Sequence, residues 1–360
     1  MQVGVLLEQC LAPVPGGTGR YSRELAAALA ANAPEGSSVV GVTAWHRARP
    51  EVPGVRRGRR LPLPRRPLVA AWERGSGPGV PGDLVHAPTP LAPPRRRTPL
   101  VVTVHDAVPW THPQTLTPRG AAWHRTAITR AAAEADLLVV PTRAVATELA
   151  RHVELRAVRV IGEGVSADLA LPPDADERAL RLGLPDRYLL TIATLEPRKG
   201  LAALVRALAE VPGIPLLCAG QQGWGGQDVV ALAAAAGVEA RVLGRVPDAD
   251  LAVLLARATA LVVPSSAEGF GLPLLEGMSL GTPVLTSDDP AMVEVAGGAA
   301  LAVPLADLVE GLRTITNDDA LRARLRQAGP VRAASYTWAG AARQLWAAYA
   351  DLPRAGGPRA

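Results

Sequence analysis

The strongest chemical pattern in the sequence is a pair of glutamates, Glu268 and Glu276, with seven residues between them. The intervening segment begins Gly269-Phe270-Gly271-Leu272 and continues with a proline that suits the first turn of a helix. Such a loop directs backbone N–H groups and a helix N-terminus at one point, an arrangement that binds phosphate. We predict that Glu276, in the first helical turn, accepts hydrogen bonds from a vicinal diol and that Glu268 contacts a second polyol. Two such acceptors beside an anion site indicate a nucleotide sugar, whereas a capping acid and a surface acid would explain neither the glycines nor the spacing.

A second pattern is a pair of cations, Arg198 and Lys199, after an apolar run that predicts a strand. Paired cations at a point where a strand gives way to a helix suit a diphosphate. The chain is rich in Ala, Gly, Pro and Arg, which is typical of a GC-rich genome. Lys199 is the only lysine among 38 lysine and arginine residues. Codon bias would favour arginine at this position, so the presence of a lysine indicates a functional role for the pair and not merely exposed charges.

Two weaker patterns lie nearer the N-terminus. Gly16 and Gly17 follow the first predicted strand and precede a helix, where N–H groups of glycine can approach a ligand closely. Their spacing fits neither a Rossmann fingerprint nor a Walker loop, and a tight turn explains it equally well. His105-Asp106 stands at the carboxyl end of another predicted strand, where open α/β sheets bind ligands. It is either a polar or acid–base pair, or a histidine satisfied by neighbouring backbone.

The elements that must position these residues follow one pattern. Short apolar runs alternate with Ala/Leu-rich helical patterns, which indicates parallel sheets covered on both faces. Examples are a strand at Val3–Leu7, a helix at Arg20–Ala31 after a glycine-rich turn, and a helix at Leu272–Leu280. The alternation pauses at a Pro/Asp-rich junction, 168–176, and then restarts. The predicted fold class is therefore α/β, with two Rossmann-like domains in series.

The predicted domain boundaries follow from that junction and from the last helical pattern. We place an N-terminal, acceptor-binding domain at 1–168 and a C-terminal, nucleotide-sugar-binding domain at 169–335. A helix within 336–352 is expected to pack on the N-terminal domain. The Gly/Pro/Arg-rich tail, 353–360, is expected to be disordered.

Composition narrows the class of protein. Of 360 residues, 48% are hydrophobic and 20% charged, which excludes a disordered chain, and no apolar run reaches the length of a membrane span. Met1–Leu7 lacks the features of a signal peptide, and two cysteines cannot form a disulfide framework, so we expect a cytoplasmic protein. The net charge of +5 favours anionic partners, but aromatic residues make up only 3%, so nucleic acid is not an expected partner.

A stretch rich in Gly, Pro and Arg, 50–81, interrupts the alternation. Six arginines between Arg56 and Arg66 precede Leu68, Val69 and Trp72 there. The simpler interpretation is a solvated loop whose arginines reflect codon bias. The alternative is a peripheral contact with the inner membrane face, in which arginines attract anionic lipid and Trp72 is the anchor.

Taken in order, these motifs resemble those of the family 4 glycosyltransferases, which have the GT-B fold, and in particular the mannosyltransferase-like members. The matching features run over nearly the full length: Gly16–Tyr21, His105-Asp106, Pro141-Thr142, Arg198-Lys199, the Trp224 region, Glu268–Glu276 and Glu294-Val295-Ala296-Gly297. The Glu-x7-Glu motif with Gly-Phe-Gly-Leu-Pro is specific, and the other features support it.

The resemblance implies a retaining transferase with its donor in a deep cleft between two domains. By that analogy Arg198 and Lys199 bind the diphosphate, Glu276 the ribose and Glu268 the donor sugar. The catalytic residues would be Lys199, Glu268 and His105, the last near the transferred sugar.

The same analogy places Gly16 and Gly17 at the border of the diphosphate or the acceptor. One departure is Thr194, where many relatives have an arginine; Arg198 can substitute for it. The family needs no metal, the common Asp-x-Asp metal motif is not evident, and no cofactor is expected.

The function predicted from this resemblance is transfer of a hexose, with mannose favoured, to a glycan or lipid-linked acceptor in polysaccharide biosynthesis. GDP-mannose is the favoured donor and a UDP-sugar the alternative. Two other functions stay open: isomerisation or hydrolysis of nucleotide sugars on the same fold, and a non-catalytic subunit that binds a nucleotide sugar.

Overall fold

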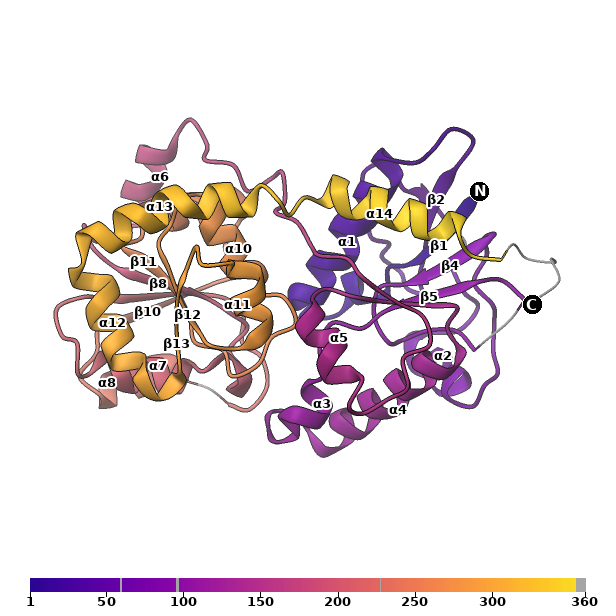
Figure 1. The fold of residues 1–360 in the computed structure, drawn as a ribbon, viewed down its shortest axis with the longest axis horizontal. Helices are drawn as coiled ribbons and strands as arrows, with labels where there is room; N and C mark the ends of the chain where they lie inside the picture. The colour runs from indigo at the N-terminus through magenta and orange to yellow at the C-terminus, as the bar shows by residue number, and fades with distance from the viewer. Residues whose placement is uncertain (59, 95–96, 227, 354–360) are drawn as a thin grey trace. The chain divides into compact units, whose positions relative to one another are not determined.

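The computed structural model describes residues 1–58, 60–94, 97–226 and 228–353 (Figure 1). It divides into two compact units. Unit 1 comprises Met1–Gly164 together with the segment that begins at Thr337, and unit 2 comprises Val165–Tyr336. The expected boundary at 168/169 lies four residues beyond the observed division. Residues 354–360, most of the tail for which disorder was predicted, lie outside the described residues.

Unit 1 is built on a seven-stranded sheet in the order β3-β2-β1-β4-β5-β6-β7, with every strand pair parallel. Its strands are β1 Gln2–Leu6, β2 Ser38–Val42, β3 Arg56–Arg57, β4 Leu84–Ala87, β5 Leu100–Thr103, β6 Leu137–Val140 and β7 Val158–Val160. Its helices are α1 Gly16–Ala31, α2 Arg65–Glu73, α3 Val108–Thr111, α4 Pro118–Glu134, α5 Arg143–Leu149 and α14 Trp338–Ala350, with short 3-10 helices at Glu8–Leu11 and Pro113–Thr115. Every residue of β4, β5 and β6 is buried, which accounts for their continuous apolar sequences.

The last helix, α14, completes unit 1 although it follows unit 2 in the sequence. It lies beside α1 (Figure 1), and Trp346 Nε1 donates a hydrogen bond to Leu29 O at 3.0 Å. Thr337 caps its N-terminus by accepting from Gly340 N. The chain thus returns to the first unit through a helix with a buried apolar face.

Unit 2 is built on a six-stranded parallel sheet in the order β10-β9-β8-β11-β12-β13. Its strands are β8 Leu189–Ile192, β9 Leu216–Ala219, β10 Ala240–Gly244, β11 Ala260–Val263, β12 Val284–Ser287 and β13 Leu301–Val303. Its helices are α6 Ala175–Arg181, α7 Leu201–Leu208, α8 Val229–Ala235, α9 Asp248–Arg257, α10 Leu272–Ser279, α11 Pro290–Ala296, α12 Leu308–Asn317 and α13 Asp319–Ala333, with 3-10 helices at Pro197–Lys199 and Leu305–Asp307. Two parallel α/β units confirm the predicted fold class.

The first helix begins earlier than predicted. We expected a glycine-rich turn before Arg20, but α1 starts at Gly16, so the glycines form its first turns. Pro15 already has helical torsion angles, and Gly19 N donates to its carbonyl at 3.0 Å. A Cβ on Gly19 would lie 2.4 Å from the Pro15 Cβ, so glycine at this position allows the turn to close.

Both interpretations of the arginine-rich stretch need correction. It is not simply a solvated loop, because it contains β3 and α2. It does not present a membrane anchor either, because Leu68 and Trp72 on α2 are each 1% exposed and Trp72 Nε1 donates to Pro78 O. Leu68 and Trp72 are one helical turn apart in the sequence, and both pack into the core. Arg59, part of the same stretch, lies outside the described residues.

Across the ranges that the structure describes, no helix is both long and apolar enough to cross a bilayer.

Candidate functional site

The carboxyl ends of β8 and β11 bring the main predicted residues of unit 2 together. The chain passes from β8 to β9 on one side, whereas β11 pairs with β8 on the other side. Open α/β sheets bind ligands outside such a reversal of strand order. The segment after β8 carries Arg198 and Lys199, and the segment after β11 carries Glu268. The topology therefore collects the two cations and the first glutamate at one place.

Within this cluster the Glu268 carboxylate bridges both cations. Oε1 accepts from Lys199 Nζ at 2.5 Å, and Oε2 accepts from Arg198 Nη1 at 2.9 Å. Arg198 Nη2 also donates to Glu196 Oε1 at 3.0 Å, and Nη1 donates to Ala267 O at 2.6 Å. Two cations are thus paired with two carboxylates. A diphosphate that approached these cations would have to exchange with Glu268.

The environment separates the pKa values of the carboxyl groups in the cluster. Burial alone would raise the pKa of Glu268, but the charges of Arg198 and Lys199 outweigh it and lower that pKa to about 2. For Glu196 burial dominates, and its pKa is raised in spite of the neighbouring Arg198. Glu268 is therefore a firmly ionised acceptor, suited to hold cations or sugar hydroxyls and unsuited to donate a proton at neutral pH.

A third carboxylate, Asp289, supports the loop that carries Glu268. It caps α11 by accepting from Ala291 N and Met292 N at 3.0 and 3.2 Å, and it accepts from Glu268 N at 3.4 Å. Burial raises its pKa to about 6, although the same backbone N–H groups oppose the rise. Asp289 is not among the residues predicted from the sequence, although an Asp before Pro290 is a signal for a helix N-terminus.

Glycine conformation lets the two loops approach each other. Gly200, directly after Lys199, has φ +68°, and a Cβ there would lie 1.9 Å from Pro264 O at the end of β11. The loops are also joined by Ser266 N, which donates to Arg198 O at 2.9 Å. Both cations are consequently held against the strand end from which the Glu268 loop begins.

The remaining residues of the Glu-x7-Glu motif are largely buried. Gly271, with φ +87°, precedes α10, which starts at Leu272. Glu276 is the fifth residue of α10, so it lies in the second turn and not in the first as predicted, and it is 3% exposed. Phe270 packs edge-on against Tyr336 with the ring centres 5.3 Å apart, and Gly269 is also buried. The motif is part of the core at one end and reaches the cation cluster at the other.

In unit 1, His105 lies two residues beyond β5 and is held from two sides. Its Nε2 lies 2.8 Å from Pro88 O, just beyond β4, and its Nδ1 lies 3.5 Å from Glu163 Oε1. A carbonyl and a carboxylate are both acceptors, so this geometry suits an imidazolium with a proton on each nitrogen. Burial lowers the pKa of His105, but the hydrogen bond and charge of Glu163, together with the Pro88 carbonyl and the charge of Asp106, outweigh it, and the net shift is upward.

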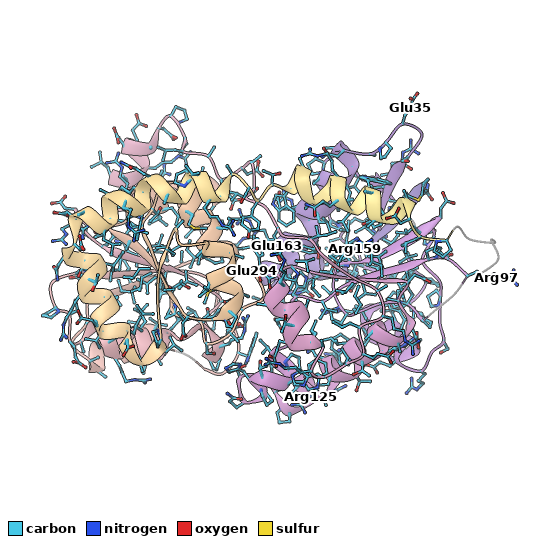
Figure 2. All side chains as sticks on the ribbon, viewed as in Figure 1. Glu35, Arg97, Arg125, Arg159, Glu163 and Glu294 are labelled. Carbon is cyan, nitrogen blue, oxygen red and sulfur yellow. The ribbon has the colours of Figure 1, made fainter. Side chains whose placement is uncertain are left out.

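Glu163 is a buried residue that the sequence analysis missed. It follows β7 and is 4% exposed, and Figure 2 labels it together with Arg159 of that strand. The signal available was an acidic residue between Gly162 and Gly164 directly after a strand. Asp106, which was predicted together with His105, instead accepts from Val108 N at the start of α3.

His105 packs against a network of buried hydrogen bonds that involves Tyr21, Thr103 and His86. The Tyr21 ring meets the His105 ring edge-on at 4.5 Å, and the Tyr21 hydroxyl lies 3.1 Å from Thr103 Oγ1. His86 bonds Thr103 through Nε2 at 2.9 Å and the Tyr349 hydroxyl through Nδ1 at 2.5 Å. Burial and the charge of His105 lower the pKa of His86 to about 3, so His86 is neutral. Tyr21 of α1 thus contacts His105 directly, and Tyr349 of α14 holds His86 in the layer behind it.

Gly16 and Gly17 lie on the exposed N-terminal turn of α1, one to two turns before Tyr21, and a Cβ on Gly17 would contact nothing. These glycines and His105 belong to unit 1, whereas the residues from Arg198 to Glu276 belong to unit 2. The predicted site residues are therefore divided between the two units.

The Glu163→Gln substitution tests the assignment of a protonated His105. Because Glu163 raises the pKa of His105 above its unfolded value, this pair stabilises the fold at pH values below about 6.5, and the effect is lost as pH rises through the folded pKa. We expect the variant to melt at a lower temperature than wild type near pH 6, with a smaller difference in alkaline buffer. When the histidine Cε1 protons are titrated by NMR, one histidine of the variant should have a lower pKa than in wild type. A pH-independent melting difference would contradict the assignment.

Comparison with known proteins identifies the family. Residues 15–169 match the family model described as Glycosyltransferase Family 4, and residues 174–332 match the model described as Glycosyl transferases group 1. The two matches run through both units. The chain belongs to the family 4 glycosyltransferases. The relatedness predicted from the Glu-x7-Glu motif and its companions is confirmed.

A curated relative of this family 4 glycosyltransferase agrees with that assignment. The O-antigen chain mannosyltransferase B of Escherichia coli is 36% identical over 173 residues, which are 45% of this chain and 45% of that protein. The chain spans about half the length of the curated relatives it matches.

Solved structures of known glycosyltransferases share the fold. The sucrose-phosphate synthase of Thermosynechococcus elongatus superposes with a TM-score of 0.79 at 22% identity, over 98% of this chain and 99% of that chain. Anabaena HepE in complex with UDP-glucose superposes with a TM-score of 0.75 at 20% identity, over 98% and 100% of the two chains. The fold of this family 4 glycosyltransferase is therefore GT-B.

Proposed function

We propose that this family 4 glycosyltransferase transfers a hexose, with mannose favoured, from a nucleotide diphosphate sugar to a glycan or lipid-linked acceptor. The observation that carries the proposal is the cation cluster of Arg198 and Lys199 at the carboxyl ends of β8 and β11, beside Glu268. Two cations in a mostly buried setting suit a diphosphate. The HepE structure contains UDP-glucose, and the Escherichia coli relative is a mannosyltransferase. The HepE complex supports a nucleotide sugar, and the Escherichia coli relative supports mannose.

In the proposed reaction the bond from the anomeric carbon to the diphosphate breaks and negative charge accumulates on that leaving group. The anomeric carbon forms a bond to the oxygen of an acceptor hydroxyl, whose proton is released. Arg198 and Lys199 stabilise that charge because they are already positioned and largely shielded from water. When the diphosphate takes over these cations, the ionised Glu268 becomes available to accept hydrogen bonds from the donor sugar. Retention of configuration is part of the proposal, without assignment of a nucleophile. The proposed reaction needs no metal.

The proposal is tested by nucleotide release from a panel of GDP-mannose, UDP-glucose and UDP-N-acetylglucosamine, with and without glycan acceptors, in buffer with and without a chelator. Acceptor-dependent release that the chelator leaves unchanged is the expected result. The anomeric configuration of the product, determined by NMR, tests retention. Release that is independent of acceptor would favour a hydrolase. If none of the three nucleotide sugars binds, the proposal is rejected.

We expect GDP to bind more tightly than UDP, because the proposed donor is GDP-mannose. Calorimetric titration of the two nucleotides compares their dissociation constants directly. UDP binding that is tighter by about tenfold, equivalent to about 1.4 kcal/mol, would reject mannose transfer from GDP-mannose.

The Glu276→Ala substitution is expected to weaken nucleotide binding by about 1–3 kcal/mol, because the proposed ribose diol loses a charged acceptor. Calorimetry with the preferred nucleotide measures the loss. The matched control is Glu310→Ala on α12, whose side chain is 74% exposed and should leave affinity unchanged. Equal affinities in wild type and Glu276→Ala would remove Glu276 from the donor site.

A further inference from the structure

A basic cavity at the carboxyl ends of β2 and β3 in unit 1 has no part in the proposed donor chemistry. Its volume is about 210 Å³. Its inner wall is formed by Leu7, Gly41 and Thr43, which lie at the ends of β1 and β2. This is the edge of the sheet at which α/β proteins bind ligands. The cavity therefore lies in a place where a ligand is expected.

The outer wall of the cavity carries an excess of positive charge. The charged lining residues are Arg49, Arg56, Arg57, Arg60 and Glu51. Arg57 Nη2 pairs with Glu51 Oε1 at 2.5 Å, so one arginine is balanced by the one carboxylate of the lining. The other three arginines of the lining have no second acidic residue in that lining to balance them. An anion is the ligand that this wall favours.

Arg60 gives the most specific indication. Its Nη2 donates to Arg47 O at 2.8 Å, which holds the guanidinium in place. Its Nε is buried and has no hydrogen-bond partner among the described residues. A buried donor without an acceptor costs free energy, and native proteins retain such groups mostly where a ligand or water satisfies them. The guanidinium of Arg60 is thus held at the lining of the cavity, with one buried donor that no described residue satisfies.

Hydrogen bonds and close packing join the segments around the cavity. Gly58 N donates to Gly41 O at 3.0 Å, and a Cβ on Gly58 would lie 2.3 Å from that oxygen, so the arginine-bearing segment lies directly against β2. Glu8, which follows Leu7, is buried and accepts from Ala44 N at 2.9 Å and lies 2.8 Å from His46 Nε2. Glu8 therefore joins the segments that follow β1 and β2 beside the cavity.

We propose that this cavity binds a phosphate ester carried by the acceptor substrate; its role in the acceptor rests on the function proposed above. Guanidinium forks match pairs of phosphate oxygens. The cavity volume is about 210 Å³. That space admits a phosphate with an adjoining glycerol or part of a sugar, and is smaller than a site for a whole ligand. The cavity therefore recognises the phosphorylated end of a larger acceptor.

Calorimetric titration of the full chain with glycerol 3-phosphate, and with glycerol as the neutral counterpart, tests the site without any donor. Binding of the phosphate ester alone is the expected result. Arg60→Gln and Arg49→Gln are each expected to weaken it by about tenfold or more. Arg60→Lys keeps the charge but loses the fork and should also weaken binding. The matched control is Arg74→Gln beyond the end of α2, which should leave binding unchanged.

Sedimentation with vesicles separates two sources of the same phosphate chemistry. If vesicles of phosphatidylglycerol, but not of phosphatidylcholine, bind wild type and bind Arg60→Gln poorly, the phosphate belongs to a lipid headgroup. If only the binding of glycerol 3-phosphate depends on Arg60, the phosphate belongs to a soluble acceptor.

The outcomes for this site and for the proposed function are distinguishable. If glycerol 3-phosphate fails to bind, or binds wild type, Arg60→Gln and Arg49→Gln alike, the anion site is overturned even where nucleotide sugars are turned over. If the phosphate ester binds through Arg60 but no nucleotide sugar binds or is turned over, the anion site stands and the transferase proposal fails. The melting temperature of each variant shows whether it is folded.

Discussion

Replacement of Lys199 by alanine is expected to lower kcat by about 10²–10³-fold, the loss typical for removal of one preorganised group that stabilises developing negative charge. Lys199 Nζ is fixed by Glu268 at 2.5 Å, and the side chain is only 15% exposed. Its charge therefore acts on the diphosphate in a medium of low effective dielectric constant. Because charge on the leaving group grows in the transition state, kcat should fall more than donor affinity.

Two further variants sharpen this expectation. Lys199→Arg keeps the positive charge and should retain more activity than Lys199→Ala. Arg206→Ala on α7 removes an exposed cation from the same unit and should leave turnover unchanged. The measurement is steady-state nucleotide release at saturating donor. If Lys199→Ala and Arg206→Ala have the same kcat, Lys199 has no role in leaving-group stabilisation.

The fold was predictable because its signals are local and repeated. The buried strands β4, β5 and β6 are continuous apolar runs, and the limits of α7 and α14 follow helical spacing. The start of α1 was not predictable in the same way. Glycines at its first positions lower helix propensity, and the helix closes there because Gly19 fits against Pro15. Tertiary packing decided that boundary.

The candidate site was predictable only in part, for a related reason. Arg198, Lys199 and Glu268 stand at strand ends, so sequence order and topology together bring them into one cluster. Glu163 is close to His105 only because the segment after β7 reaches the end of β5, a contact between positions far apart in the sequence. No local pattern encodes that pairing. The prediction for Trp72 failed although its signal is local. The arginines near it indicated a loop, whereas Leu68 and Trp72 form the buried side of a helix.

Replacement of Glu268 by glutamine is expected to separate stability, nucleotide binding and turnover. The substitution keeps the shape of the side chain but removes the carboxylate that accepts from Lys199 and Arg198. Arg198 still donates to Glu196 Oε1 and to Ala267 O. Breaking a buried ion pair on one side costs about 3 kcal/mol of unfolding free energy. The pKa of Glu268 is lowered to about 2, so its contribution is present above the unfolded value near 4.5 and is lost as pH falls toward 2. Wild type and variant should therefore differ most at neutral pH.

Nucleotide binding should respond in the opposite direction from stability. In wild type a diphosphate must displace the Glu268 carboxylate from Arg198 and Lys199, and in Glu268→Gln that competing anion is absent. Pyrophosphate or the preferred nucleoside diphosphate should bind the variant at least as tightly as wild type, and should raise its melting temperature by more. Turnover should nevertheless fall, because the proposed acceptor for the donor sugar has lost its charge. Thermal melts across pH with and without pyrophosphate, together with kcat, measure all three effects. If diphosphate affinity and turnover fall in parallel, Glu268 does not compete with the diphosphate for these cations and instead positions them for it.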